Sequence, residues 1–359
     1  MSNVAVIGTG FVGTTTGAVL AHLGHSVVCA DVIPEKVELL NSGHVPILEA
    51  GLEDLVRTGL DSGLLRFVVG EAAAVEDAEF VFLCVQTPQG SDGSADLTYI
   101  VNAAEAMSPH LRSETIVINK STVPVGSTKV VEQALARSDV FVVSNPEFLR
   151  EGSAVHDTLN PDRIVIGSED QAAAMRVAAL FETLKAPLVI TDPASAETIK
   201  YASNAFLATK VSFINAIANV CEAVGADVRE VVLGMGYDKR IGFEFLKPGP
   251  GWGGSCFGKD TRALIHTAQD AGYDFHLLGG VIAVNEEQFD RMAAKVREAC
   301  GGTLDGMTVA AWGLTFKART NDLRDSPAIE VIRRLQNAGA TVRAYDPSHP
   351  SADDDMLHG

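Results

Sequence analysis

The fold of this 359-residue chain is indicated first by the stretch Gly8-Thr9-Gly10-Phe11-Val12-Gly13. It follows an apolar run, Val4–Gly8, and opens a helical pattern, Val12–Leu23. In a strand–turn–helix unit of this kind, the first glycine permits the tight turn and the second lets backbone approach a pyrophosphate. The third lets helix and strand pack closely, while the helix N-terminus offers N–H groups and a positive dipole to the phosphates. The stretch therefore predicts a dinucleotide-binding turn.

Asp31 indicates which dinucleotide is bound. It closes the next apolar run, Ser26–Asp31, 18 residues after Gly13. A carboxylate at this place accepts hydrogen bonds from both ribose hydroxyls and repels a 2′-phosphate. The sequence therefore predicts NAD as cofactor, in preference to NADP. The alternative, a chance glycine-rich turn, is disfavoured because strand, helix and Asp31 all stand at the required spacing.

Short apolar runs alternate with helical segments over the first half of the chain. Strands that are buried on both faces and connected by helices form a parallel, doubly wound sheet. We therefore predict an α/β fold with an N-terminal doubly wound Rossmann-type sheet. The predicted strands are Val4–Gly8, Ser26–Asp31, Phe67–Gly70, Phe80–Val85, Thr115–Asn119, Val140–Ser144, Arg163–Gly167 and Leu188–Thr191. The predicted helices are Val12–Leu23, Leu97–His110, Ser127–Ala136 and Gln171–Leu184.

The pattern changes after Pro193, where no breaker interrupts an apolar helical pattern until about Val224. A helix of this length, roughly 45 Å at 1.5 Å per residue, can connect two domains. More helices follow, and a strand–helix–strand unit begins after the hinge-like pair Gly301-Gly302. The later helices are Val228–Met235, Thr261–Ala271, Leu277–Cys300 and Pro327–Asn337, and the later strands are Met307–Trp312 and Thr341–Asp346. We predict three domains: Rossmann-type 1–192, central helical 193–301, and an apparently incomplete Rossmann-like 302–359.

Composition limits the partners of the chain. Lys and Arg total 28 and Asp and Glu total 46, which gives a net charge of −18. We expect no nucleic-acid and no membrane partner, because both reward basic surfaces and because no apolar run reaches the roughly 18 residues that span a bilayer. Five scattered cysteines without a Cys-x-x-Cys pair, and an N-terminus unlike a signal peptide, predict reduced thiols, no metal site and a cytoplasmic protein.

A second glycine-rich stretch, Gly249–Asp260, carries one cysteine, Cys256. So much glycine lets backbone wrap a ligand and hold a thiol close to it. Cysteine attacks carbonyl carbons readily, and Lys259 nearby would favour its thiolate form. Asp260 lies within reach of Cys256 if a helix starts here. The plainer interpretation is a buried structural cysteine, which is what we expect for Cys29, Cys84, Cys221 and Cys300.

Further polar groups stand at strand ends and on the long helix. Lys200 and Asn204 share one helix face, although a solvated lysine is an equal alternative. Lys120–Pro124 and Asn145–Glu151 follow strand ends, where ligands of doubly wound sheets bind; helix caps or surface charges are the alternative. The basic turn Gly313–Lys317, with Arg324 and Asp325 beyond it, suits a nucleotide diphosphate better than NAD, unless these are solvated linker charges.

From Val4 to about Pro347, the chain contains these stretches in the order in which they occur in the UDP-glucose 6-dehydrogenases. It therefore resembles that branch of the UDP-glucose/GDP-mannose dehydrogenase family. The most specific match is Phe245-Leu246-Lys247, then Gly251–Cys256, then Lys259-Asp260, which is similar to the family's catalytic loop. Dehydrogenases of UDP-N-acetylmannosamine typically have His before the cysteine, so Ser255 indicates the glucose branch. Gly258 differs from the proline common in bacterial members, which should loosen the turn.

The resemblance implies a four-electron oxidation in which UDP-glucose, two NAD and water give UDP-glucuronate. The C6 alcohol becomes an aldehyde, Cys256 captures it as a thiohemiacetal, a second oxidation leaves a thioester, and water hydrolyses it. It further implies a homodimer built on the long helix and a UDP-binding C-terminal domain. Family members continue for several tens of residues beyond this chain, so we expect that domain to be incomplete here.

The resemblance also assigns roles to residues that match family motifs. The catalytic set is Cys256, Lys200, Asn204, Asp260, Thr122, Glu147 and Glu151: Lys200 and Asn204 stabilise an oxyanion, Asp260 orients Lys200, and Thr122, Glu147 and Glu151 hold the catalytic water. The cofactor-binding set is Gly8, Gly10, Phe11, Val12, Gly13, Asp31, Lys36, Thr87, Thr122 and Glu151. The substrate-binding set is Glu147, Phe148, Leu149, Lys200, Asn204, Arg240, Phe245, Lys247, Gly253 and Lys317, with Arg240 offered across the dimer interface and Lys317 contacting UDP.

Three alternatives stay open at this point. The chain can be a dehydrogenase of another nucleotide sugar, of the GDP-mannose or UDP-N-acetylmannosamine type. It can be a two-electron 3-hydroxyacid dehydrogenase, although such enzymes need no loop thiol. It can also be an inactive nucleotide-sugar binder, although every proposed catalytic residue is present.

Overall fold

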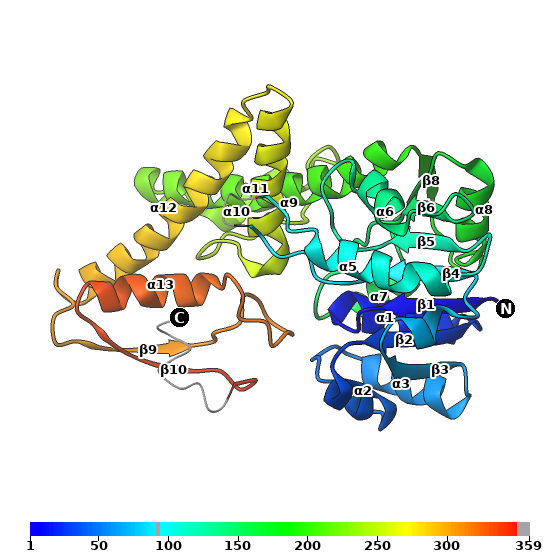
Figure 1. Ribbon diagram of the computed structural model, residues 1–359. Helices are drawn as coiled ribbons and strands as arrows, with labels where there is room; N and C mark the ends of the chain where they lie inside the picture. The colour runs from blue at the N-terminus through cyan, green and yellow to red at the C-terminus, as the bar shows by residue number, and fades with distance from the viewer. Residues whose placement is uncertain (91–93, 350–359) are drawn as a thin grey trace. The chain divides into compact units, whose positions relative to one another are not determined.

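The chain folds into two compact units, Met1–Lys200 and Tyr201–Gly359, in a computed structural model that describes residues 1–90 and 94–349 (Figure 1). Helices and strands occur in both units, which confirms the predicted α/β class. The first unit holds a large sheet and the second a group of helices followed by two strands. The finer division into 1–192, 193–301 and 302–359 stays a prediction.

An eight-stranded sheet forms the centre of the first unit, in the order β3-β2-β1-β4-β5-β6-β7-β8. The chain winds outward from β1 in both directions, as in a doubly wound sheet, so the glycine-rich turn after β1 lies where the order reverses. The strands are β1 Asn3–Ile7, β2 Ser26–Asp31, β3 Leu65–Val69, β4 Phe80–Leu83, β5 Ile116–Asn119, β6 Phe141–Ser144, β7 Ile164–Gly167 and β8 Leu188–Thr191.

The expectation of a wholly parallel sheet is wrong at one position. β6 and β7 are antiparallel and pair through Ser144 and Gly167, whereas the other neighbouring strands of this sheet are parallel. A parallel connection requires a crossover that returns the chain to the starting end of the sheet, usually through a full helix. Between β6 and β7 the described chain has only the six-residue helix α7, and the chain turns back instead.

Helices cover both faces of the sheet and bury a separate apolar cluster on each. Residues of α1, α2, α3 and α8 join one cluster, and residues of α4, α5 and α6 join the other. Helices α2, α3, α4 and α7 were not predicted. The helices are α1 Phe11–His22, α2 Pro34–Asn41, α3 Leu52–Asp61, α4 Ala72–Val75, α5 Thr98–Met107, η1 Ser108–His110, α6 Ser127–Leu135, α7 Ala154–Leu159 and α8 Gln171–Ala179.

The predicted long helix is present as α9, Pro193–Val224, and it runs from the first unit into the second. Among the described residues it is the one helix that is long and apolar enough to cross a membrane by length and composition. The same helix carries buried polar residues, Glu197, Lys200 and Asn204 among them. Their side chains contact protein groups, whereas only 28% of the apolar window of this helix is buried.

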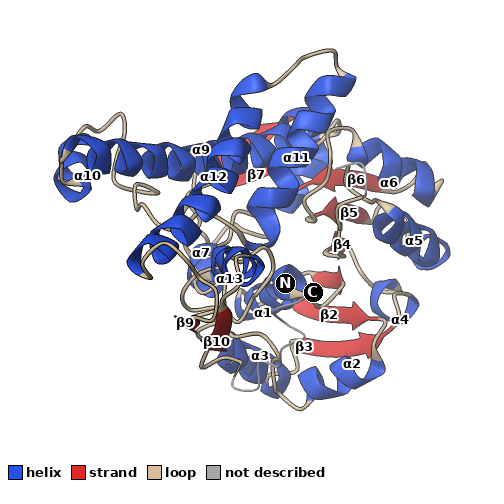
Figure 2. Cartoon of the chain, turned by 90° about the vertical axis from the view of Figure 1, so that its left-hand side faces the viewer, coloured by secondary structure: helices blue, strands red, loops and turns tan. Residues whose placement is uncertain are grey.

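The second unit is largely helical and ends in a small sheet (Figure 2). Strands β9 and β10 are parallel, and α13 packs its apolar face on them through Ile329, Ile332 and Leu335. The elements are α10 Val228–Gly236, α11 Gly254–Asp270, α12 His276–Ala299, β9 Thr308–Trp312, α13 Pro327–Asn337 and β10 Thr341–Tyr345.

Candidate active site

The glycine-rich turn has the shape that a dinucleotide needs. Gly8 has a φ of 94°, and a Cβ there would lie 2.7 Å from the carbonyl oxygen of Cys84. A Cβ at Gly13 would lie 1.8 Å from the carbonyl oxygen of Gly8. At Gly10 nothing lies within 4 Å of that position, so the backbone is open to an approaching pyrophosphate. Helix α1 starts at Phe11 and no side chain caps it, which leaves its first N–H groups available to an anion.

Asp31, at the end of β2, is held as an anion beside this turn. It accepts hydrogen bonds from Thr9 N at 3.0 Å and Thr9 Oγ1 at 2.5 Å, and Lys36 Nζ lies 2.7 Å away. Burial alone would raise the pKa of Asp31, but the hydrogen bonds from Lys36 and Thr9 outweigh it and lower that pKa. The charged carboxylate and the open glycine turn together fit NAD.

Glu147 and Lys200 form a buried ion pair in the first unit. Lys200 Nζ lies 2.8 Å from Glu147 Oε1, and the two residues are 4% and 6% exposed. The other carboxylate oxygen of Glu147 accepts a hydrogen bond from Leu149 N at 2.9 Å. Lys200 is therefore not the solvated lysine that the sequence alone allowed. A buried ammonium beside a buried carboxylate is the kind of group that can stabilise a developing oxyanion or move a proton.

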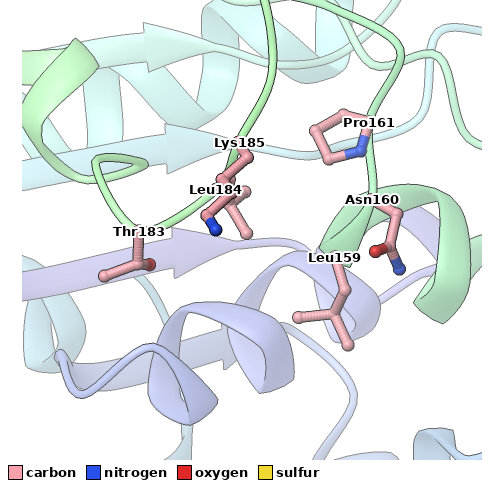
Figure 3. A pocket seen from close by; sticks show the side chains of 6 residues that line it. All are labelled: Leu159, Asn160, Pro161, Thr183, Leu184 and Lys185. Carbon is pink, nitrogen blue, oxygen red and sulfur yellow. The ribbon is translucent and has the colours of Figure 1, made fainter.

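The ring of Phe148 lies next to this pair and close to two cationic side chains. Lys200 Nζ is 5.6 Å from the ring centroid, and the guanidinium carbon of Arg163 is 3.6 Å from it. A pocket of about 150 Å³ is lined by Lys120, Asn145 and the segment from Glu147 to Arg150, among others. The larger pocket of Figure 3, about 310 Å³, is lined by residues outside every predicted site: Leu159, Asn160, Pro161, Thr183, Leu184 and Lys185.

Two buried carboxylates that the sequence did not single out hold the loops around the predicted water site. Glu197 accepts hydrogen bonds from Gly126 N at 2.6 Å and from Thr128 N at 2.9 Å, just beyond Thr122. Glu49 accepts one from Gly152 N at 2.7 Å, directly after Glu151. The carbonyl oxygen of Thr122 also accepts a hydrogen bond from the buried Thr87 at 2.9 Å.

Cys256 lies on a helix and not in a loop. Helix α11 begins at Gly254, earlier than the predicted start at residue 261, so Cys256 and Asp260 are one helical turn apart. Cys256 is exposed, whereas Asp260 is fully buried. Asp260 Oδ2 accepts a hydrogen bond from Asn204 Nδ2 at 2.6 Å, and Asp260 Oδ1 lies 2.9 Å from Lys259 Nζ. This arrangement places the thiol one helical turn before a buried carboxylate that contacts an amide and an ammonium.

The expectation that Gly258 loosens a turn is also wrong, because Gly258 is a buried helical residue. A Cβ there would lie 3.0 Å from a carboxylate oxygen of Asp325. The other cysteines are buried, or partly buried at Cys300, as predicted. Burial raises the pKa of Cys84 to about 12 and that of Cys29 still further, so both are neutral thiols.

Side-chain amides hold the segment that leads to the thiol. Asn285 accepts a hydrogen bond from Trp252 N at 2.8 Å and donates one to Trp252 O at 3.0 Å. Asn215 Oδ1 accepts one from Gly249 N at 2.8 Å, and Gln288 donates one to Gly249 O at 2.8 Å. These four bonds replace the backbone partners that a glycine-rich segment lacks, so its path is fixed.

The basic turn that contains Lys317 packs against the same helix start. Gly254 N donates to Arg324 O at 3.1 Å, and a Cβ at Gly253 would lie 1.8 Å from Asp325 O. Lys317 Nζ lies 5.3 Å from the centroid of the Phe316 ring. The basic stretch and the glycine-rich stretch, which are separate in sequence, are therefore neighbours in the second unit.

The remaining predicted residues lie farther from these contacts. Arg240 is exposed and pairs with Asp238 at 2.5 Å. The Phe245 ring lies 6.2 Å from that of Phe257, and Lys247 is exposed. Each unit thus gathers its own part of the predicted set: Lys200, Glu147, Phe148 and Leu149 in the first, and Asn204, Cys256, Asp260, Gly253 and Lys317 in the second.

Comparisons with known proteins agree along the chain. Models of the UDP-glucose/GDP-mannose dehydrogenase family match it at residues 2–185 (NAD binding domain), 194–287 (central domain) and 310–358 (UDP binding domain). The UDP-glucose 6-dehydrogenase TuaD of Bacillus subtilis is 47% identical over 352 residues, covering 97% of this chain and 76% of the relative. The UDP-glucose 6-dehydrogenase of Rhizobium meliloti is 47% identical over 354 residues, covering 96% and 81%.

A solved structure agrees as well. A UDP-glucose dehydrogenase from the archaeon Pyrobaculum islandicum superposes with a TM-score of 0.94 at 40% identity, covering 99% of this chain and 85% of that one.

Proposed function

The chain belongs to the UDP-glucose/GDP-mannose dehydrogenase family, and from this membership we infer that it catalyses the NAD-dependent oxidation of UDP-glucose to UDP-glucuronate. The observation that carries the four-electron form of this reaction is the exposed thiol of Cys256, one helical turn from the buried Asp260. A two-electron 3-hydroxyacid dehydrogenase needs no such thiol. Relatives at 47% identity that are named UDP-glucose 6-dehydrogenase favour glucose over other sugars.

The first unit supplies the cofactor site. The open backbone at Gly10 and the uncapped start of α1 would hold the pyrophosphate, and Asp31 would hold the ribose hydroxyls. Phe11 and Val12 begin α1, Lys36 lies in the first turn of α2, and Thr87 follows β4. Bound NAD would accept one hydride in each of the two oxidations.

Lys200 and Asn204 stabilise the oxygen at C6 as it gains negative charge. The ammonium of Lys200 is buried, so its field acts with little screening by water. Glu147, with Thr122 and Glu151 near the loops that Glu197 and Glu49 anchor, holds the water that is used in the last step. A carboxylate that already accepts hydrogen bonds can orient a water and take its proton.

Cys256 retains the intermediate between the two oxidations. Its sulfur adds to the C6 aldehyde, the aldehyde oxygen takes a proton, and a thiohemiacetal forms. Loss of a second hydride and a proton leaves a thioester. Water then adds to the acyl carbon, the carbon–sulfur bond breaks, and the carboxylate leaves as the thiol is restored. Asp260, which contacts Asn204 and Lys259, positions the polar groups around this step.

The stoichiometry of the reaction tests this proposal. Purified protein is incubated with UDP-glucose and excess NAD, and NADH is counted by absorbance against UDP-glucuronate by chromatography. Two NADH for each sugar oxidised are expected. One NADH, an accumulating aldehyde, or faster turnover of GDP-mannose or UDP-N-acetylmannosamine than of UDP-glucose would contradict it.

We also propose a homodimer formed through α9. Phe206, Phe213 and Val220 recur every seven residues along this helix and are 65%, 50% and 55% exposed. Residues at this spacing form one stripe on a helix, and an exposed apolar stripe on a folded protein usually meets another protein surface. A second copy of the chain would cover it and would bring Arg240 to the partner's substrate.

The oligomeric state of a single variant tests this interface. In analytical ultracentrifugation, wild type should sediment as a dimer and Phe213→Glu as a monomer. A wild-type monomer, or a dimeric Phe213→Glu variant, would contradict it. A cytoplasmic location without membrane or nucleic-acid binding remains part of the proposal, supported by the net charge of −18.

A further inference from the structure

Two pockets of the first unit adjoin each other next to Glu147. The inner pocket, about 150 Å³, is lined by Glu147 and by Lys120 and Asn145, which directly follow β5 and β6. The outer pocket, about 310 Å³, lies between the segment after α7 and the segment before β8 (Figure 3). Three residues line both pockets: Asn160, Pro161 and Leu184. The two pockets therefore meet at these three residues.

The antiparallel pairing of β6 and β7 places both pockets beyond the end of β6. The pair Ser144–Gly167 joins the last residues of the two strands, so the start of β7 extends past β6 toward Phe148. Arg163, just before β7, accordingly has its guanidinium carbon 3.6 Å from the centroid of the Phe148 ring. β8 runs parallel to β7, so the segment before β8 reaches the same place. In a wholly parallel sheet these segments would lie at the opposite edge.

The inner pocket has the polar lining that water requires. Lys120 Nζ donates a hydrogen bond to Asn145 Oδ1 at 3.1 Å, and Asn145 Nδ2 donates one to Val165 O at 2.7 Å. Arg150 and Asp157 also line this pocket, and their side chains are 2.7 Å apart. A buried water needs about two to four polar partners and a space of roughly one water molecule. The inner pocket offers both.

The proposed reaction consumes water beside a carboxylate that is almost closed to solvent, since Glu147 is 6% exposed. In the last step the water oxygen bonds to the acyl carbon and the carbon–sulfur bond breaks. One water proton goes to the sulfur, and the other leaves to solvent from the new carboxylic acid. The acyl group is still attached to Cys256 when this water arrives, so the sugar nucleotide occupies its own entrance. A separate route for water removes that conflict.

We propose that the two adjoining pockets are this route, and that the water used in thioester hydrolysis reaches Glu147 past Asn160, Pro161 and Leu184. This inference rests on the proposed function. Within residues 1–90 and 94–349, neither the glycine turn nor Lys200 lines either pocket, so the route approaches Glu147 apart from the cofactor turn. At its outer end Asn160, Thr183 and Lys185 are exposed, and the route opens to solvent there.

The test blocks the junction of the pockets with a larger side chain. Leu184→Trp blocks it from the segment before β8, and Asn160→Trp blocks it from the segment after α7. Leu188→Trp, an exposed leucine of β8 that lines neither pocket, is the matched control. A blocked route slows hydrolysis but not the two oxidations, so kcat should fall about tenfold while kcat/KM for UDP-glucose stays unchanged. The control should keep both wild-type values.

Mass spectrometry of enzyme quenched with acid during turnover measures the fraction of Cys256 that carries the acyl group. This fraction should be larger in both blocked variants than in wild type and in Leu188→Trp. Asn160 is exposed, so Asn160→Trp decides the question if Leu184→Trp fails to fold.

The inference is overturned if a folded blocked variant keeps the wild-type kcat, or loses kcat without a larger acylated fraction. The second result would show a structural effect and not slower hydrolysis. A wild-type protein that forms no NADH from UDP-glucose, or one NADH for each sugar, would overturn the proposed function and this inference with it.

Discussion

Asn204 donates a hydrogen bond from its Nδ2 to Asp260 Oδ2 across 2.6 Å, and so ties the long helix α9 to the helix that carries the thiol. The second oxygen of Asp260 lies 2.9 Å from Lys259 Nζ, and the carboxylate is completely buried. A buried charge is tolerated only when it is paired and hydrogen-bonded. The charge of Asp260 is therefore part of how α9 and α11 are held together.

Asp260→Asn tests this relationship. The amide keeps the size of the carboxylate but removes its charge, so Lys259 loses its ion-pair partner and Asn204 loses its strongest acceptor. We expect the free energy of unfolding to fall by about 1–3 kcal/mol and NADH formation to fall roughly 100-fold, measured by urea denaturation and by absorbance. Asp270→Asn, at the exposed end of the same helix, is the control and should leave both values nearly unchanged. Wild-type activity in Asp260→Asn would exclude a catalytic part for this carboxylate.

The cysteines should differ sharply in reactivity. Cys256 is exposed at a helix start, whereas Cys29 and Cys84 are buried and burial raises the pKa of the Cys84 thiol to about 12. Iodoacetamide reacts with thiolates, so brief labelling near about pH 8 should modify Cys256 first and leave Cys29 and Cys84 intact. Peptide mass spectrometry of the native protein identifies the labelled site. Cys256→Ala should abolish turnover and Cys300→Ala should keep it; an active Cys256→Ala enzyme would rule out covalent capture.

Asp31 should set the choice of cofactor. Its carboxylate sits beside the glycine turn with Lys36 at 2.7 Å. Asp31→Ser removes the charge that repels a 2′-phosphate and leaves Lys36 to attract one, so the ratio of kcat/KM for NAD over NADP should fall at least about tenfold. Steady-state kinetics with both cofactors measure this ratio. Lys36→Met is the matched second substitution: added to Asp31→Ser, it should lower the kcat/KM for NADP. An unchanged ratio would show that Asp31 does not face the ribose.

The parts of the site that are predictable from sequence are those that local patterns determine. Gly8, Gly10 and Gly13 have roles that depend only on the turn between β1 and α1, and Asp31 stands at a fixed distance from that turn. The sequence of α9 contains no helix-breaking residue after Pro193, so it predicts a helix without reference to any other segment. The glycine turn, Asp31 at the end of β2 and the helix α9 are present in the structure, and the binding roles of these residues stay predictions.

The parts that sequence could not supply depend on contacts between distant segments. Lys200 meets Glu147 across 53 positions, which decides that this lysine is buried and not solvated. At the early start of α11, Gly254 N donates a hydrogen bond to Arg324 O, 70 positions away, and no propensity favours a helix beginning in so many glycines. Glu197 was detectable in principle, because Glu197, Lys200 and Asn204 share one face of an otherwise apolar helix.

Asn285 should control the shape of the segment that leads to Cys256. It makes two buried hydrogen bonds to the backbone of Trp252, at 2.8 and 3.0 Å. Asn285→Ala leaves both backbone groups without these partners, so we expect a loss of about 1–3 kcal/mol in the free energy of unfolding and a lower kcat. Glu287→Ala, two positions along on the exposed side of α12, is the control. Urea denaturation and NADH formation measure the two effects, and equal behaviour of the two variants would contradict this role.

Glu197 predicts a pH dependence of stability. Burial raises the pKa of Glu197 even though it accepts hydrogen bonds from Gly126 and Thr128. The folded protein therefore binds this proton more tightly than the unfolded chain, and the contribution to stability is fullest below the ordinary glutamate value of 4.5. It declines as the pH rises through the raised folded-state value.

Glu197→Gln cannot ionise and so lacks that decline. Comparing urea denaturation of the two proteins at about pH 5 and about pH 8, we expect the difference in unfolding free energy to move in favour of the variant as the pH rises. A tenfold difference in proton affinity corresponds to about 1.4 kcal/mol, which sets the scale of the change. Glu182→Gln, an exposed glutamate of the same unit, should show no such movement. A constant difference, or one that moves toward wild type, would mean that the hydrogen bonds from Gly126 and Thr128 favour the ionised carboxylate more than burial disfavours it.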